Sequence, residues 1–449
     1  MNNPSIWSDT ITPLTYPSLA KDMTTDILII GGGMTGLLCG HFLHEQGRDY
    51  ILIDQGNIAD HTTAGTTAKI TTQHGLIYSN LLRYQGKDIA QGYYQANKEA
   101  MDRLIAMAQN IDCDFQYQTN LVYDMESQQA IEDEIKALED IGGAAIFVKN
   151  PEGLPITPKA AVATLHQAQF HPLKFAMAIA AGQSKKQNHI YQYTKALNIE
   201  KEGTGYRVIV QSSRDQRPHE IRAKEVIIAT HFPFKNIRGL YFVKMYQARS
   251  YAVLLEEVSK NKMRSFMAMG SNPGDLSIRN YRNKVILGGR GGKTGQTHGG
   301  FAQLFQDAKE YFPEARVTHA WAAQDCITLD QMPYIGNYNP SFPGIKVATG
   351  YNKWGMTTSM LAALSLTDQM DRELSDIFYP HRSMMHPQAL VNLATSTVNL
   401  IKPKKPRCTH LGCALQWNKE EQSWDCPCHG SRYGKDGAIL NEPAQKPLP

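Results

Sequence analysis

The segment from Asp26 to Asp54 constrains the fold of this chain more than any other. It reads DILIIGGGMTGLLCGHFLHEQGRDYILID, an apolar strand, a glycine turn, a helix-length run and a second strand that ends in an acid. Gly31, Gly33 and Gly36 have the G-x-G-x-x-G spacing. In such a turn the glycines permit the bend, the approach of a pyrophosphate and close helix–strand packing, and the acid accepts hydrogen bonds from a ribose. The segment predicts a Rossmann-like dinucleotide-binding unit, but it does not distinguish FAD from a nicotinamide cofactor.

The overall charge argues for a small-molecule substrate. A net charge of +4 on 449 residues gives no single-sign field of the kind that attracts nucleic acid or an acidic membrane. The N-terminus lacks a basic region followed by an apolar run, and no stretch offers about 18 uninterrupted apolar residues. We therefore expect a cytoplasmic protein without a transmembrane segment.

Four cysteines crowd into the C-terminal segment, in CTHLGC (408–413) and CPCHGSRY (426–433). A Rieske [2Fe-2S] centre needs Cys-x-His followed after an interval by Cys-x-x-His, because two cysteines hold one iron and two histidines hold the other. Cys408, His410, Cys426 and His429 fit this pattern as metal ligands. A structural Cys2His2 zinc site is the alternative.

The same segment resembles Rieske proteins of the high-potential kind in further positions. In those proteins a disulfide joins the two ligand loops where Cys413 and Cys428 stand here, and hydrogen bonds to sulfur come from the positions of Ser431 and Tyr433. Zinc would leave these residues unexplained. A Rieske domain normally continues with further strands beyond the position of Pro449, so we expect this module to be truncated.

Several segments between residues 24 and 372 resemble FAD-dependent oxidoreductases related to D-amino-acid and glycine oxidases. They are TTAGTTAKITTQHG (62–75), VIIATHFP (226–233), TLDQMPYIG (328–336) and ATGYNKWGMTTS (348–359). The resemblance implies FAD as the cofactor. It places these further residues beside FAD: Thr66, Thr67, Lys69, Gly350, Gly355 and Met356.

Strand-like and helix-like segments are interleaved, which favours two domains that share the chain. We expect an α/β (α+β) fold with a Rossmann-like FAD-binding domain, an interleaved mixed-sheet substrate domain and a small all-β Rieske domain. The expected boundaries are 1–84, 151–245 and 320–375 for the FAD-binding domain, 85–150 and 246–319 for the substrate domain, 376–405 for a linker and 406–449 for the Rieske domain.

The family resemblance implies oxidation of a carbon–nitrogen bond by hydride transfer to the flavin, with the electrons leaving through the Rieske cluster to an acceptor that the sequence does not identify. Asp325 stands where carboxylate-binding relatives carry an arginine, which favours a cationic amine over an amino acid. Trp321, Lys353 and Trp354 are the other candidate catalytic residues. The alternative is a non-catalytic electron-transfer or redox-sensing protein.

Overall fold

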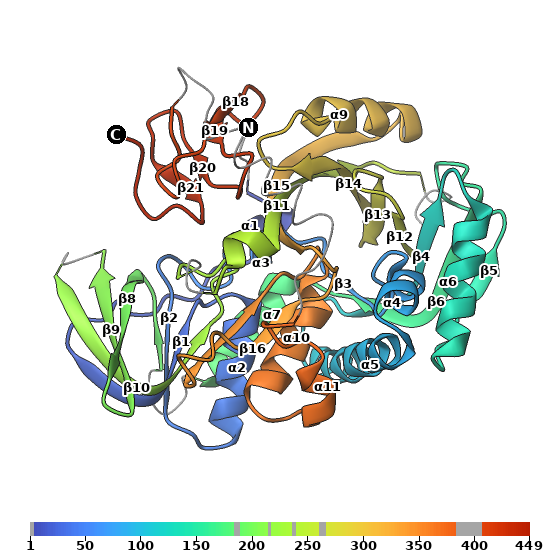
Figure 1. The fold of residues 1–449 in the computed structure, drawn as a ribbon. Coiled ribbons are helices and arrows are strands. Elements are labelled where there is room, and N and C mark those ends of the chain that lie inside the picture. Colours follow the sequence, from blue (N-terminus) through green and yellow to red (C-terminus); the bar gives the residue numbers. More distant parts are fainter. Residues whose placement is uncertain (1–3, 184–188, 214–216, 236–238, 260–265, 383–405) are drawn as a thin grey trace.

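The computed structural model describes residues 4–183, 189–213, 217–235, 239–259, 266–382 and 406–449 (Figure 1). Within these ranges the strands form three sheets, of eight, nine and four strands. The two larger sheets take their strands alternately along the chain, whereas the smallest sheet comes entirely from the C-terminal end. This arrangement confirms the expected α/β fold with two interleaved domains and a small all-β module.

The first sheet contains the glycine turn. Its central strands are parallel and buried along most of their length, which explains why the runs ILII and YILI are apolar without alternation. In spatial order the strands are β16 (Tyr334–Asn337), β17 (Ile345–Thr349), β10 (Pro218–Ile228), β1 (Met23–Ile30), β2 (Tyr50–Ile53) and β7 (Ile190–Tyr191), with β9 (Gly205–Ser212) on β10 and β8 (Thr194–Glu202) on β9.

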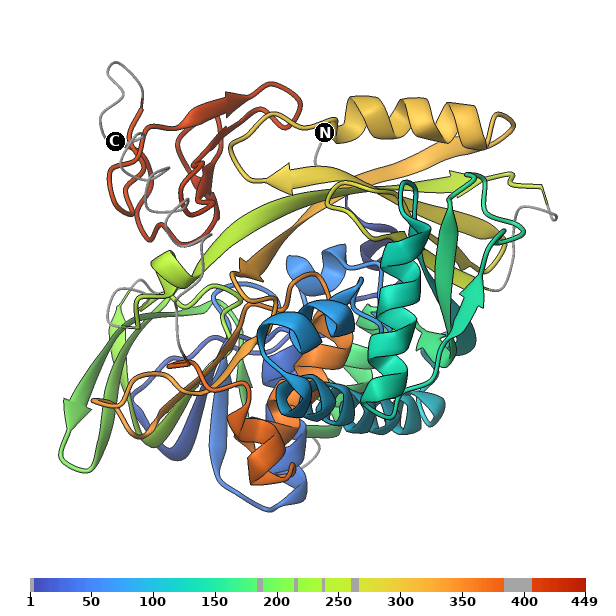
Figure 2. The ribbon, with the colours of Figure 1, turned by 45° about the vertical axis from the view of Figure 1, so that its right-hand side comes forward.

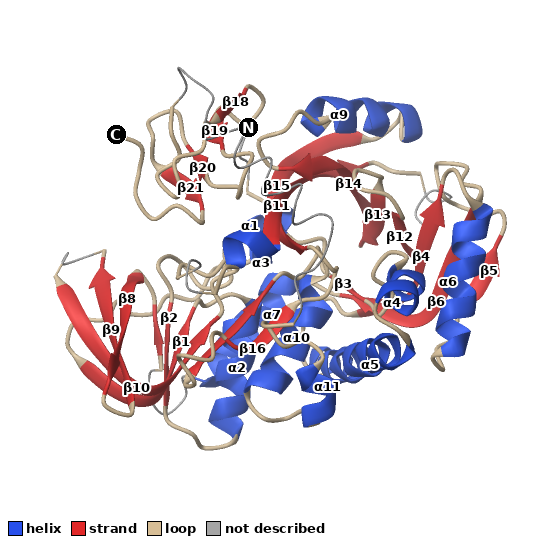
Figure 3. Cartoon of the chain, in the orientation of Figure 1, coloured by secondary structure: helices blue, strands red, loops and turns tan. Residues whose placement is uncertain are grey.

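Four helices lie together beside the first sheet, as Figure 3 shows. α2 packs against two of the others, α7 and α10, and α10 also packs against the long helix α5. α2 and α10 are apolar on nearly all sides because they lie inside this helical layer. The four helices are α2 (Met34–Glu45), α5 (Lys87–Gln109), α7 (Pro172–Gln183) and α10 (Gly355–Leu366).

The second sheet curves away from the first. α9 (Gly300–Tyr311) packs on β11 and β14, while α6 (Gln128–Asp140) packs on β6 and on α4 (Ile77–Tyr84). The strand order is β15 (Arg316–Thr328), β11 (Met245–Glu256), β14 (Lys284–Lys293), β13 (Ser277–Tyr281), β12 (Phe266–Gly270), β4 (Gln116–Asp124), β6 (Ala160–Gln169) and β3 (Lys69–Ile70), with β5 (Ile146–Val148) on β6. Short helices complete the two domains: α1 (Ile6–Asp9), α3 (Thr62–Gly65), α8 (Tyr241–Lys244) and α11 (Arg372–Asp376).

The structure divides the chain between the sheets differently from the expected boundaries. β6 lies inside the range 151–245 that we expected in the FAD-binding domain, yet it pairs with β4 in the second sheet. β15 also belongs to the second sheet, although its last part falls in the range 320–375. Conversely, α5, from the range 85–150, packs on α10 of the first domain. Buried strands of this composition fit either sheet, so long-range pairing decides where they lie.

The C-terminal domain is a four-stranded antiparallel sheet with a core of its own. Its strands are β18 (Gln416–Asn418), β19 (Ser423–Asp425), β20 (Arg432–Tyr433) and β21 (Ile439–Asn441). Figure 2 shows this domain next to α9, at one end of the second sheet. Most of the expected linker, 383–405, lies outside the described residues. No described helix has both the length and the apolar character needed to cross a membrane.

Candidate functional site

A cavity of about 700 Å³ lies where the two larger sheets meet. Its wall includes Gly31 and Gly33 of the glycine turn, Trp321 and Asp325 of β15, and Glu442 of the C-terminal domain. Cofactor and substrate sites commonly have volumes of about 300–1,000 Å³. One cavity therefore reaches from the dinucleotide-binding turn to the cysteine- and histidine-rich domain.

The three glycines of the turn have different surroundings. Gly31 has φ +110°, and a Cβ there would lie 2.4 Å from the carbonyl oxygen of Ala229. A Cβ on Gly36 would lie 1.9 Å from the Gly31 oxygen, so Gly36 serves helix packing and does not border the cavity. At Gly33 the nearest atom would be 3.4 Å away, and the residue borders the cavity. The missing side chain of Gly33 therefore leaves room for a ligand to reach the backbone, which fits a pyrophosphate.

Asp54 directly follows β2 and bonds the backbone of the glycine turn and of its own loop. Its Oδ2 accepts a hydrogen bond from the Gly32 N–H at 2.7 Å and its Oδ1 accepts one from the Gly56 N–H at 2.8 Å. Burial raises the pKa of Asp54, and the two N–H donors oppose that rise. Each carboxylate oxygen keeps a further lone pair, so the residue can also accept hydrogen bonds from a ribose.

The other expected cofactor residues, Thr66, Thr67, Lys69, Gly350, Gly355 and Met356, all border the cavity. α10 begins at Gly355, and no side chain caps its N-terminus. Its first N–H groups are thus available to a negatively charged or polar edge of a cofactor. Gly350 has φ +76°, and a Cβ there would lie 2.3 Å from the Thr328 Cγ2 atom.

Lys69 lies on β3 of the second sheet, and its side chain reaches two other strands of the same sheet. Its Nζ donates hydrogen bonds to the Ala268 carbonyl oxygen and to the Ser277 hydroxyl oxygen. Burial lowers the pKa of Lys69 to about 7, and the positive charge of Arg279 acts in the same direction. The residue is thus a buried amine on the side of the cavity that belongs to the second sheet.

The candidate catalytic residues on β15 lie on one face of that strand. Trp321 and Asp325 both border the cavity, because residues four apart on a strand point the same way. The Trp321 Nε1 donates a hydrogen bond to the Gly65 carbonyl oxygen at 3.0 Å, and the side chain is buried. Burial raises the pKa of Asp325, while the positive charges of Lys353 and His231 oppose this rise.

Trp354 and Lys353 come from the loop before α10. Trp354 stacks on His74, with ring centroids 4.8 Å apart. His74 was not among the sequence candidates, although it lies in the loop 62–75. Its Nδ1 bonds the Tyr93 hydroxyl at 2.7 Å and its Nε2 bonds the Thr71 carbonyl oxygen at 2.9 Å. Burial lowers the pKa of His74 to about 3, so the ring is neutral and held in place.

His231 is a second cavity residue that was not among the candidates from the sequence. It has φ +62° and lies in the loop that follows the strand β10. Its Nε2 atom is buried and has no hydrogen-bond partner among the described residues. Burial lowers the pKa of His231, and the nearby carboxylates of Asp325 and Glu442 oppose the shift.

The four expected metal ligands come from two loops of the C-terminal domain. Cys408 and His410 precede β18, while Cys426 and His429 lie between β19 and β20. The rings of His410 and His429 are 5.1 Å apart, and the thiols of Cys408 and Cys426 interact directly. The Nδ1 atom of His429 is buried without a hydrogen-bond partner among the described residues. Two thiols and two imidazoles on facing loops fit a Rieske cluster.

The hydroxyl groups expected near sulfur lie close to Cys408. The Tyr433 hydroxyl is 3.3 Å from the Cys408 sulfur, and it also accepts a hydrogen bond from the Thr409 N–H. The Ser431 hydroxyl likewise bonds the Cys408 thiol. Hydrogen bonds of this kind stabilise a more negative sulfur.

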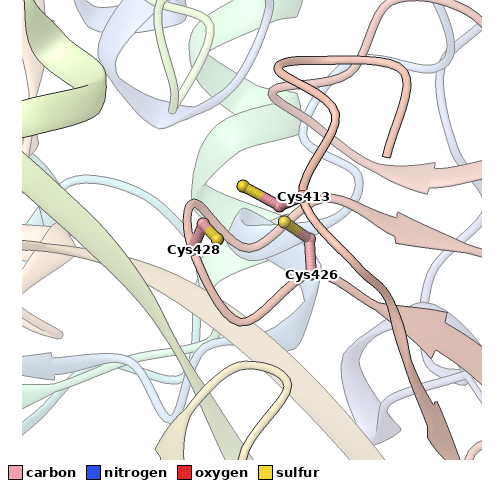
Figure 4. Close-up of side chains that lie close together, drawn as sticks. All are labelled: Cys413, Cys426 and Cys428. Atoms are coloured by element: carbon pink, nitrogen blue, oxygen red, sulfur yellow. The ribbon is translucent and has the colours of Figure 1, made fainter. Parts of the chain in front are cut away.

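The expected disulfide between Cys413 and Cys428 is not formed in the structure. The sulfurs of Cys413 and Cys428 lie with that of Cys426 within 4.8 Å of one another (Figure 4). A disulfide needs an S–S distance of about 2.05 Å.

Comparison with known proteins agrees with both halves of this site. Residues 26–369 match the family described as FAD dependent oxidoreductase, and residues 389–449 match the Rieske [2Fe-2S] domain. The Bacillus subtilis (strain 168) protein provisionally named Rieske 2Fe-2S iron-sulfur protein YhfW is 32% identical over 98% of this chain and 96% of its own length.

Solved structures show the same fold in the flavoprotein part. Glycine oxidase from Geobacillus kaustophilus has a TM-score of 0.65 and 16% identity, and the match covers 81% of this chain and 100% of that chain. L-proline dehydrogenase from P. horikoshii has a TM-score of 0.64 and 15% identity, with 80% of this chain and 98% of that chain covered. The chain thus belongs to the FAD dependent oxidoreductase family, with FAD as its cofactor, and it carries a C-terminal Rieske domain for a [2Fe-2S] cluster.

Proposed function

We propose that this protein oxidises a carbon–nitrogen bond of a small amine or amino acid and passes the electrons on through its Rieske domain. The observation that carries the proposal is the single cavity that extends from Asp54 past Trp354 to Glu442. Two proteins of similar fold, a glycine oxidase and an L-proline dehydrogenase, are named for amino-acid substrates. When bound, FAD accepts a hydride from the substrate carbon and the cluster accepts single electrons.

The residues that would hold FAD border the cavity, whereas the expected cluster ligands lie outside its wall, in the C-terminal domain that contributes Glu442 to it. Gly31, Gly33 and Asp54 would bind the pyrophosphate and ribose of FAD, and the N-terminus of α10 would face its polar edge. Cys408, His410, Cys426 and His429 would hold the cluster. The remaining cavity walls are then left for the substrate.

Asp325 is the residue that we propose to attract the substrate amine. It is a partly buried acid on the cavity wall, and burial raises its pKa. A carboxylate there stabilises a cationic group and repels an anionic one. The positive charge of Lys353 opposes the rise that burial causes in the pKa of Asp325, and so it favours the ionised carboxylate.

The aromatic residues would orient the substrate. Trp354 is fixed by its stack on His74, and Trp321 is fixed by its hydrogen bond to Gly65. Both of the His74 ring nitrogens have partners, so we assign this histidine no proton-transfer role. Rigid walls that hold a reacting carbon in place contribute to catalysis by positioning.

Lys69 favours an amino acid within the proposed substrate class. It is a buried amine on the cavity wall, and its described side-chain hydrogen bonds go to uncharged acceptors on the second sheet. A substrate carboxylate would supply the missing negative charge. Charged groups of both signs on the wall also favour a catalytic role over a redox relay, which needs no substrate pocket.

The test is anaerobic bleaching of the flavin by matched pairs of compounds, each pair an amine and its α-carboxylated counterpart. Asp325→Asn should slow bleaching by both members of a pair, whereas Lys69→Met should slow only the carboxylated member. Asp60→Asn, at an exposed acid on the rim of the same cavity, is the control. If no amine or amino acid bleaches the flavin, the proposed reaction is wrong.

A further inference from the structure

The Rieske domain is attached to the second sheet through the side chain of Gln247. This residue lies on β11 and is 2% exposed. Its Nε2 donates hydrogen bonds to the carbonyl oxygens of His429, at 3.0 Å, and of Glu442, at 2.7 Å. The same side chain borders the cavity. Gln247 therefore contacts the backbone of an expected cluster ligand on one side and the cavity on the other.

A second glutamine on the neighbouring strand holds the amide of Gln247 in one orientation. The Gln324 Nε2 donates to the Gln247 Oε1 at 2.6 Å and to the Gly430 carbonyl oxygen at 2.8 Å. The Gln324 Oε1 in turn accepts a hydrogen bond from the Thr294 hydroxyl. Because both ends of the Gln247 amide have partners, a rotation of the amide would break three hydrogen bonds.

The backbones approach so closely here that no side chain fits between them. Gly430 has φ +88°, and a Cβ there would lie 2.5 Å from the Gln247 Cβ. Gly295, two residues after the end of β14, has φ +76°, and a Cβ there would lie 2.6 Å from the Pro427 nitrogen. Two glycines thus bring the ligand loop into direct contact with the second sheet.

The ring of His429 faces the flavoprotein part of the chain. It is buried, and it packs against Phe242, whose ring centroid is 5.7 Å away. At the far side of the same interface, the Glu420 carboxylate accepts hydrogen bonds from the N–H groups of Phe301 and Ala302, at the start of α9. The domain is therefore also held at a place away from Gln247.

We propose that Gln247, oriented by Gln324, is a positioning residue that keeps the His429 edge of the Rieske domain docked on the flavin cavity, so that electrons cross without movement of the domain. The inference rests on the proposed electron route. In each transfer the reduced flavin loses one electron and the cluster gains one, no protein bond is made or broken, and the flavin proton goes to solvent. An external one-electron oxidant regenerates the cluster between transfers.

The experiment follows electron transfer from flavin to cluster in the intact protein after photoreduction of FAD, which requires no substrate. Gln247→Leu keeps the size of the side chain but removes all of its hydrogen bonds. It should slow cluster reduction by about tenfold or more, because a misplacement of about 1 Å can slow a reaction by about 10²-fold. Gln324→Met, which removes only the orienting partner, should have a smaller effect in the same direction. The transfer rate in the wild-type protein should not depend on solvent viscosity.

Two controls separate positioning from general loosening of the interface. Glu420→Gln perturbs the second attachment, and it should leave the transfer rate within about twofold of wild type, since it lies away from the ligand loop. The electron paramagnetic resonance spectrum and midpoint potential of the cluster should be the same in all variants. Equal slowing by Glu420→Gln, an unchanged rate in Gln247→Leu, or a viscosity-dependent wild-type rate would each overturn the proposal.

The test of Gln247 can succeed or fail independently of whether the protein oxidises an amine or an amino acid. If no amine or amino acid bleaches the flavin but photoreduced FAD reduces the cluster as described, the proposed reaction fails and the positioning role of Gln247 stands. If substrates bleach the flavin but the cluster stays oxidised after photoreduction, the electron route and this inference both fail. Should Gln247→Leu not retain iron, the Gln324→Met variant and the viscosity measurement on the wild-type protein decide the matter.

Discussion

The Glu421 carboxylate of the Rieske domain forms a buried ion pair with the Arg249 guanidinium of β11, across the interface between the two parts of the chain. The Glu421 side chain is 1% exposed, and Arg432 lies on its other side at 2.9 Å. Removing one member of a buried pair leaves an uncompensated charge. The interface therefore depends on this carboxylate.

We predict that Glu421→Gln destabilises the protein by about 3–5 kcal/mol, the usual effect of breaking a buried ion pair. Urea unfolding followed by the loss of cluster absorbance measures the change. The exposed pair of Lys98 and Asp102 on α5 offers a control, since Asp102→Asn should change stability little. Similar losses in the two variants would contradict the importance of the interface pair.

The same carboxylate should make stability depend on pH in the acid range. Burial alone would raise the pKa of Glu421, but the charges of Arg249 and Arg432 prevail and lower the pKa from 4.5 to about 2. Because the folded-state pKa is the lower one, the contribution of this carboxylate is complete above about pH 4.5 and is lost as the pH falls toward 2. The stability difference between wild type and Glu421→Gln should shrink over that window. A difference that stays constant from pH 6 to pH 3 would refute the assignment.

Asp54→Ala should weaken FAD binding by about 1–3 kcal/mol, because the N–H groups of Gly32 and Gly56 and the ribose hydroxyls would lose their acceptor. Fluorescence titration of the apoprotein with FAD measures this effect. Asp60→Ala changes an acid on the rim of the same cavity and should leave the affinity near that of wild type. Equal affinities in wild type and Asp54→Ala would show that the residue does not bind the ribose.

Tyr433→Phe and Ser431→Ala should each lower the midpoint potential of the cluster and leave it bound. Both hydroxyls bond the Cys408 sulfur, and such bonds favour the reduced cluster. We expect the wild-type value in the upper part of the Rieske range of about −150 to +300 mV. A redox titration monitored by electron paramagnetic resonance gives the potentials, and Ser423→Ala, whose hydroxyl bonds Asp425, is the control. Zinc without iron in the purified protein would reject the ligand assignment.

Local sequence was sufficient to predict the two cofactor-binding segments. The glycine turn can be recognised because Gly31 and Gly36 occupy positions where a Cβ would collide with backbone, so the residue type itself reports the conformation. The ligand loops can also be recognised locally, from the Cys-x-His and Cys-x-x-His spacings. Two ligands that are two or three residues apart on one loop can bind the same cluster. These features depend on neighbours within a few residues.

Tertiary contacts decided how the cavity walls are built. β6 pairs with β4 in the second sheet, and the Lys69 side chain bonds Ser277 on another strand of that sheet. The sequence around β6 does not indicate its partner strand, and the sequence around Lys69 does not indicate Ser277. The stack of Trp354 on His74 likewise joins two loops that are far apart in the sequence. Apolar strands and polar loops are compatible with many partners, and packing selects one of them.

The docking of the Rieske domain is the clearest case of a feature that depends on residues far apart in the sequence. Gln247 and His429 stand 182 positions apart, and Arg249 and Glu421 stand 172 apart. The sequence by itself determined that the chain contains a dinucleotide-binding turn and a cluster-binding pair of loops, because each depends on residues close together in the chain. Only the tertiary structure decided that the Rieske domain docks on β11 beside the cavity, because that depends on the free energy of contacts between distant surfaces, which no local spacing encodes.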